Sequence, residues 1–149
     1  MKPEAEDLLR GKLGIVAVCA AVVFGLTLVA DEKAPESYST AMKSAGATAA
    51  PLRTKLAATP KDFDAIAKDA ATFKTIFATA LDYWTRRRVD DAIGFAKAAA
   101  TAAADLETAA KAGNEEGVTA AGGKVTGACA TCHMAHRSPR LPDGTYEIK

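Results

Sequence analysis

The stretch FDAIAKDAATFKTIFATALDYW, residues 63–84, carries the clearest structural pattern in this chain of 149 residues. Its apolar side chains recur every three or four positions, as they do along one face of an α-helix. They are Phe63, Ile66, Ala70, Phe73, Phe77, Ala80 and Trp84. This periodicity predicts an amphipathic helix whose apolar face is buried against other helices.

The same spacing recurs on both sides of this stretch. Before it lie Tyr38, Met42, Ala45, Ala49, Leu52 and Leu56. After it come Ile93, Ala96, Ala100, Ala103, Leu106 and Ala110, and then Val118, Ala121, Val125 and Ala128. Helices joined by short loops favour antiparallel neighbours, so we predict an all-α domain, an antiparallel up-and-down four-helix bundle, over residues 37–137.

Capping signals separate the predicted helices. Thr59 is expected to cap the second helix, with Pro60 at its first position, and Asp90 is expected to cap the third. Gly113 is expected to end the third helix, and Asn114 to cap the fourth. The apolar stripes along these predicted helices contain many alanines, so the core that they form buries little apolar area for its length. A large apolar prosthetic group would supply the missing volume.

The beginning of the chain has a different composition. Residues 13–30, LGIVAVCAAVVFGLTLVA, contain no charge and follow Arg10 and Lys12. Residues 1–30 are therefore interpreted as a signal peptide or an N-terminal membrane anchor, with residues 31–36 as a linker. Either reading predicts export to an oxidising compartment. Removing Cys19 with this segment leaves only Cys129 and Cys132, too few for a disulfide scaffold.

Composition and motifs also argue against several functions. The formal net charge is +1, which gives no support for nucleic-acid binding. The chain shows no paired carboxylates, no Ser-His-Asp set and no phosphate-binding glycine loop, so we expect it not to be an enzyme.

The stretch GACATCHMAHR, residues 127–137, holds both remaining cysteines. On a helix, Cys132 lies at about 300° and His133 at about 40° from Cys129, so the three share one face. This arrangement suits one covalent haem c, with thioethers at Cys129 and Cys132 and His133 as the proximal iron ligand. A zinc site that uses these residues and His136, or a thiol redox pair, is the less favoured alternative.

The motif and the predicted topology resemble the cytochrome c′ family, in which Arg follows Cys-x-x-Cys-His by four residues on the last helix. Arg137 stands at that position, and the resemblance implies that it binds a haem propionate. The resemblance implies an exported bacterial haem protein, and members of the family often form homodimers. Together with the apolar segment, it predicts a periplasmic protein that is either secreted across the inner membrane or anchored in it by residues 1–30. His136 departs from the family pattern, which usually places Tyr or Phe there. We expect His136 to pair with a propionate or solvent, or to be a pH-sensitive group near the haem edge.

The segment MKSAGA, residues 42–47, resembles the low-spin branch of this family, in which a methionine of the first helix is the sixth iron ligand. The resemblance implies that Met42 has this role. The sequence thus predicts an exported monohaem c-type cytochrome that carries one electron between redox partner proteins. The alternative is a five-coordinate haem protein that binds small gases such as NO or CO, with Met42 only filling the core.

Residues 138–149, SPRLPDGTYEIK, follow the motif and contain two prolines and an Asp-Gly turn signal. We expect a loosely held terminus. The alternative is that residues 145–149 form a short extended segment folded back on the bundle.

Overall fold

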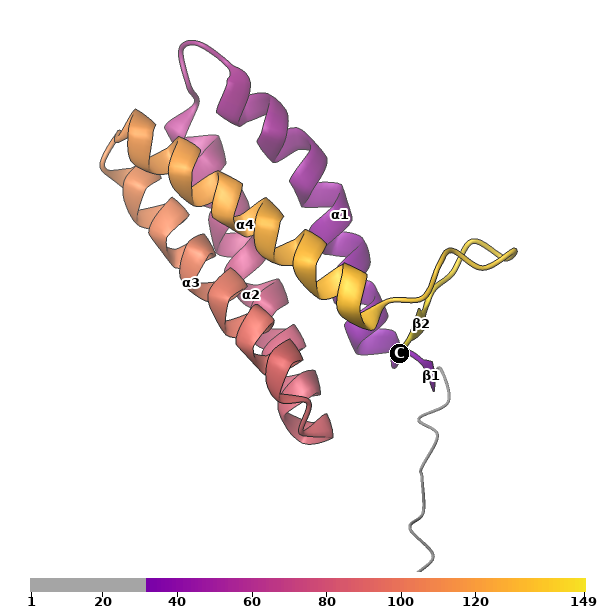
Figure 1. Ribbon diagram of the computed structural model, residues 1–149. Coiled ribbons are helices and arrows are strands. Elements are labelled where there is room, and N and C mark those ends of the chain that lie inside the picture. Colours follow the sequence, from indigo (N-terminus) through magenta and orange to yellow (C-terminus); the bar gives the residue numbers. More distant parts are fainter. Residues whose placement is uncertain (1–31) are drawn as a thin grey trace, which may run out of the picture.

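The computed structural model describes residues 32–149, in which four helices pack against each other (Figure 1). The helices are α1 (Glu36–Ala57), α2 (Phe63–Arg87), α3 (Asp90–Lys111) and α4 (Glu115–His136). Two short strands, β1 (Glu32–Lys33) and β2 (Glu147–Ile148), pair with each other. The predicted all-α class and the four helices are confirmed.

The predicted signal peptide or membrane anchor, residues 1–30, lies outside the described residues. Within residues 32–149, no helix combines the length and the apolar character needed to span a bilayer.

The core lies between the helices in two clusters of buried side chains. Six large residues of the main cluster are almost completely buried, namely Leu52, Ile66, Phe73, Leu106, Val118 and Val125. The second cluster contains Tyr38, Ala80, Trp84, Ala92, Ala96 and Ile148. The pairs α2–α3 and α3–α4 pack most extensively, whereas α1 and α4 pack least.

The junction between α3 and α4 follows the prediction. Gly113 adopts a φ of 63°, which glycine tolerates without steric cost. The N–H of Gly113 donates to Ala110 O and the N–H of Asn114 donates to Ala109 O, the Schellman pattern that ends a helix. Asn114 then caps α4, because its Oδ1 accepts a hydrogen bond from the N–H of Gly117 at 3.0 Å.

Two predicted caps are wrong. The cap of α2 is Asp62, not Thr59, because the Asp62 carboxylate reaches the N–H of Ala65 at 2.9 Å. Pro60 consequently lies in the connection before α2 and not in its first turn. Val89 occupies the cap position of α3, so Asp90 lies in the first turn, where its charge still favours the helix dipole.

The expectation of a loosely held C-terminus is also wrong. β2 pairs antiparallel with β1, with Glu32 opposite Ile148 and Lys33 opposite Glu147. Only 4% of the surface of Ile148 is exposed. The alternative of an extended segment folded back on the bundle is therefore the one that the structure shows, and the burial of Ile148 is its physical reason.

Candidate functional site

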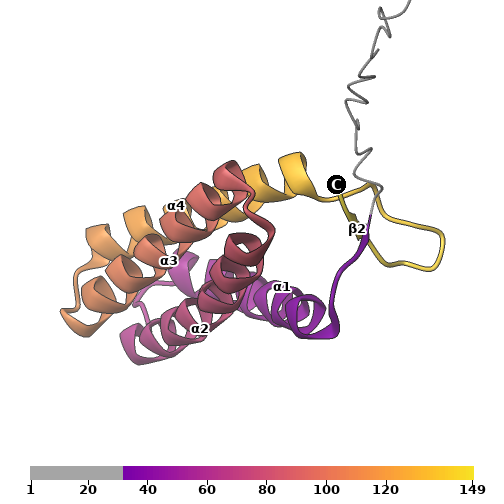
Figure 2. The ribbon, with the colours of Figure 1, turned by 90° about the horizontal axis from the view of Figure 1, so that it is seen from below.

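A cavity of about 440 Å³ lies where the start of α1, the end of α4 and the C-terminal residues meet. Figure 2 shows the C-terminal segment crossing from the end of α4 to the start of α1. The cavity is lined by Lys33, Ala34, Tyr38, Ser39, Met42 and Lys43 on one side and by Cys132, His133, His136, Arg137 and residues 144–148 on the other. Its volume lies within the range of roughly 300–1,000 Å³ that is usual for cofactor and ligand pockets.

A second, smaller cavity of about 40 Å³ lies deeper in the bundle. Met42, Cys129, Cys132 and His133 all line it. Met42, Cys132 and His133 line the larger cavity as well. The four residues predicted to hold the haem are thus brought to one place, three from α4 and one from α1.

The spacing of the apolar residues along α1 and α4 explains this placement. Met42 follows Tyr38 by one turn on the buried side of α1 and packs against both core clusters. On α4, Cys129 continues the spacing of Val118, Ala121 and Val125 and packs against the main cluster. Because His133 follows Cys129 by four positions, it also faces α1.

The two cysteines do not have the electrostatic surroundings of redox-active thiols. Both are free and half-buried. Burial raises the pKa of Cys129, and burial together with the neighbouring Cys129 and Asp91 raises the pKa of Cys132 to about 11. Reactive thiols require a lowered pKa, so these values argue against the thiol redox alternative.

The imidazole of His133 is suited to binding a metal as a neutral ligand. Burial, and to a smaller extent the positive charge of Arg137, lowers the pKa of His133. The neutral ring therefore predominates at neutral pH, and its free lone pair is the one that a metal ion requires.

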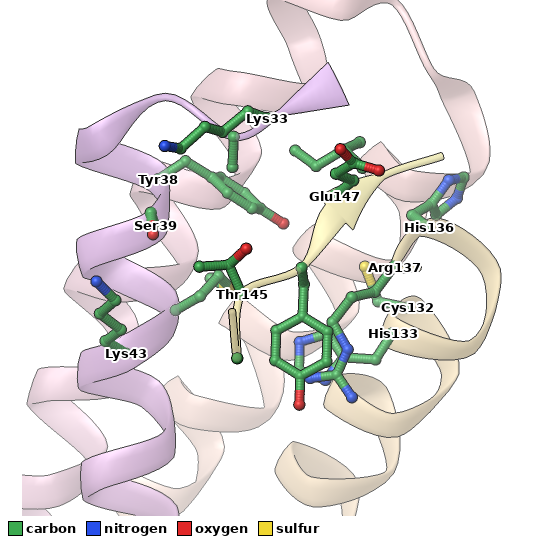
Figure 3. A pocket seen from close by; sticks show the side chains of 15 residues that line it. Lys33, Tyr38, Ser39, Lys43, Cys132, His133, His136, Arg137, Thr145 and Glu147 are labelled. Carbon is green, nitrogen blue, oxygen red and sulfur yellow. The ribbon is translucent and has the colours of Figure 1, made fainter. Parts of the chain in front are cut away.

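His136 has a structural partner of its own. Its Nε2 lies 3.0 Å from Oδ2 of Asp91 on α3, and its ring lies 5.0 Å from the ring of Trp84. Figure 3 shows the His136 ring apart from His133 and Cys132. Among residues 32–149, no group of three or more His, Cys, Asp and Glu side chains is arranged to hold a metal ion, which gives the zinc alternative no support.

Arg137 lies at the cavity, close to His133 (Figure 3). Its guanidinium carbon lies 4.2 Å from the centre of the Tyr146 ring, which is a cation–π distance. Lys33 and Lys43 also line the cavity, and among residues 32–149 Glu147 is the one carboxylate that does. The excess of positive charge around the cavity would favour an anionic group there.

Two kinds of cavity residue were not predicted from the sequence. Tyr38 lines both cavities, and Trp84 Nε1 donates a hydrogen bond to its hydroxyl at 3.2 Å. The position of Tyr38 one turn before Met42 was the signal that could have revealed it. Residues 144–148 had no comparable signal, because only the folded chain brings them to α1.

No family model, no characterised protein and no solved structure matches this chain. The resemblance to the cytochrome c′ family therefore depends on the sequence motifs and the predicted topology.

Proposed function

We propose that the protein is an exported monohaem c-type cytochrome that carries one electron, with the haem held between α1 and α4. The observation that carries the proposal is the common cavity of Met42, Cys129, Cys132 and His133. Two thiols and an imidazole on one helix, with a thioether on the facing helix, form the donor set of a six-coordinate haem c.

The residues present fit this group. Cys129 and Cys132 would bind it covalently, while His133 and Met42 would ligate its iron. Arg137 would pair with a propionate, since a guanidinium binds carboxylates well. When bound, the haem supplies an iron that changes between the ferric and ferrous states, and the ligands and the apolar surroundings tune its potential.

Covalent attachment is tested by expressing the full chain in a strain with cytochrome c maturation. The mass should exceed that of the polypeptide by one haem, and the colour should stay with the protein in acid-acetone. Cys129→Ala and Cys132→Ala should each lose one thioether, and the double variant should lose covalent haem. Cys19→Ala is the matched control and should keep the haem. A colourless wild-type product would contradict the proposal.

Ligation by Met42 is tested by the visible spectrum of the ferric protein. Wild type should be low-spin, and Met42→Ala should be high-spin and bind carbon monoxide faster in the ferrous state. Met42→Leu keeps nearly the same volume and should give the same change, which separates ligation from packing. Met134→Ala is the control, since Met134 is 74% exposed. A high-spin wild-type spectrum would instead support the gas-binding alternative.

A further inference from the structure

The last residues of the chain, 138–149, form what we call the C-terminal strap. Ser138 is buried, and the N–H of Ser138 donates to Glu147 O at 2.9 Å. The N–H of Glu147 in turn donates to Ser138 Oγ at 2.8 Å. Two further bonds, from Leu141 N–H to Thr145 O and from Gly144 N–H to Leu141 O, hold the turn of the strap. The strap therefore has a defined conformation.

The far end of the strap is attached to both sides of the larger cavity. The N–H of Lys149 donates to His136 O at the end of α4. Ile148 is buried in the cluster that contains Tyr38 of α1 and Trp84 of α2. The strap thus joins α1 and α4 at the end of the bundle where Met42 and His133 line the cavity.

The strap forms part of the cavity wall. Five consecutive strap residues, 144–148, line the cavity. Figure 3 shows Thr145 and Glu147 between the helix that carries Tyr38 and the helix that carries His133. A molecule that occupies the cavity between these helix ends therefore contacts the strap.

The strap can open without the bundle unfolding. Within it, only Ser138 and Ile148 are buried, whereas each of the four helices buries several residues in the core. Segments with few buried contacts open locally at a lower free energy than the whole domain unfolds. Ile148 is the main apolar anchor that resists this opening.

We propose that the C-terminal strap is a size-selective gate on the cavity, which hinders the entry of external ligands larger than a diatomic molecule. This inference builds on the proposed function, because the ligands are those that bind haem iron. It adds that the association rate of larger ligands depends on how long Ile148 is displaced from its buried position.

The test uses the full-chain ferrous haem protein carrying Met42→Ala, so that the sixth position is open. Association rates are measured for carbon monoxide and n-butyl isocyanide, which are both neutral. Adding Ile148→Ala should raise the isocyanide rate about tenfold or more, because truncation of a buried isoleucine favours the open strap. The carbon monoxide rate should change by less than about threefold, because a diatomic ligand needs little opening.

Two further variants make the result decisive. Deletion of residues 139–149 removes all of the strap except Ser138 and should give at least the same increase in the isocyanide rate. Ile93→Ala weakens the same cluster without touching either cavity, and should leave both rates unchanged. Hydrogen exchange of residues 138–149 shows directly whether Ile148→Ala has released the strap.

The gate is contradicted if the deletion leaves the isocyanide rate unchanged, if both ligands speed up equally, or if Ile93→Ala has the same effect as Ile148→Ala. A failure of the proposed function is seen earlier and separately, as the absence of haem from the protein's mass.

Discussion

The two ends of the α1–α4 pair differ in how the helices meet. At the closed end, Leu56 of α1 packs onto Gly122 of α4, and a Cβ at Gly122 would collide with Cδ1 of Leu56. At the open end, Tyr38 and Met42 face Cys132 and His133 across the larger cavity, and the C-terminal strap joins the helices. The same two helices therefore touch at one end and enclose space at the other.

Residue size explains the difference. At the closed end, a large side chain meets a residue that has none, so the helices approach closely. At the open end, α4 presents Cys129, Cys132 and His133 on its inner face, and no large aliphatic residue of α4 fills the space towards α1. Protein interiors are normally close-packed, so a cavity lined by thiols, an imidazole and a thioether is where we expect a ligand.

The largest predicted effect is on the free energy of unfolding, which should depend much more on the main cluster than on the open end. Leu106→Ala should lower the free energy of unfolding by about 2–5 kcal/mol, because Leu106 is fully buried in the main cluster. Ser39→Ala, in the cavity wall, should change it by less than about 0.5 kcal/mol. Urea denaturation of the purified protein measures both. Similar losses would show that stability is not concentrated in the main cluster.

A smaller effect is predicted at the contact that closes the bundle. Gly122→Val should lower the free energy of unfolding by about 1–3 kcal/mol, since the new side chain must displace Leu56. Gly123→Ala is the matched control, because its added Cβ would meet nothing within 4 Å. The control should stabilise the protein by about 0.5–1 kcal/mol through helix propensity.

The same denaturation measurement can show that the contact between Leu56 and Gly122 causes the loss of stability in Gly122→Val. Combining Gly122→Val with Leu56→Ala should recover part of the loss, because the smaller side chain makes room. Fully additive losses would mean that Leu56 and Gly122 are not in the predicted contact.

The last predicted effect is a pH dependence at the open end, which is confined to alkaline pH. Burial is the main cause that raises the pKa of Tyr38 from 10.0 to about 12. The folded protein thus binds this proton more tightly than the unfolded chain does. The resulting stabilisation is complete below pH 10 and is lost as the pH rises towards about 12.

The free energy of unfolding, measured across this alkaline range, tests the role of Tyr38. Tyr38→Phe should weaken the alkaline loss of stability, whereas Tyr146→Phe, at a more exposed cavity residue, should leave it unchanged. If the free energy of unfolding falls with rising pH as steeply in Tyr38→Phe as in wild type, burial does not shield Tyr38 from water.

Much of the fold could be predicted from local patterns. An apolar stripe with helical spacing is buried where the helix packs, so the four helices and the inward position of Met42 could be predicted from the sequence. The motif spacing predicted only that Cys129 and His133 share one helix face. The Asn114 cap was predictable because its hydrogen bond spans only three residues. Thr59 was a plausible cap in isolation, but Asp62, a stronger candidate nearby, caps α2 in its place.

The sequence by itself determined which residues share one face of α4, because the spacing Cys-x-x-Cys-His places its three side chains on one helix face in any fold that keeps the helix. Only the tertiary structure decided what faces them. The approach of α1, the pairing of His136 with Asp91 and the burial of Ile148 against Tyr38 all join residues that are far apart in the chain. Such contacts depend on how whole helices pack, and no local pattern of side chains specifies that.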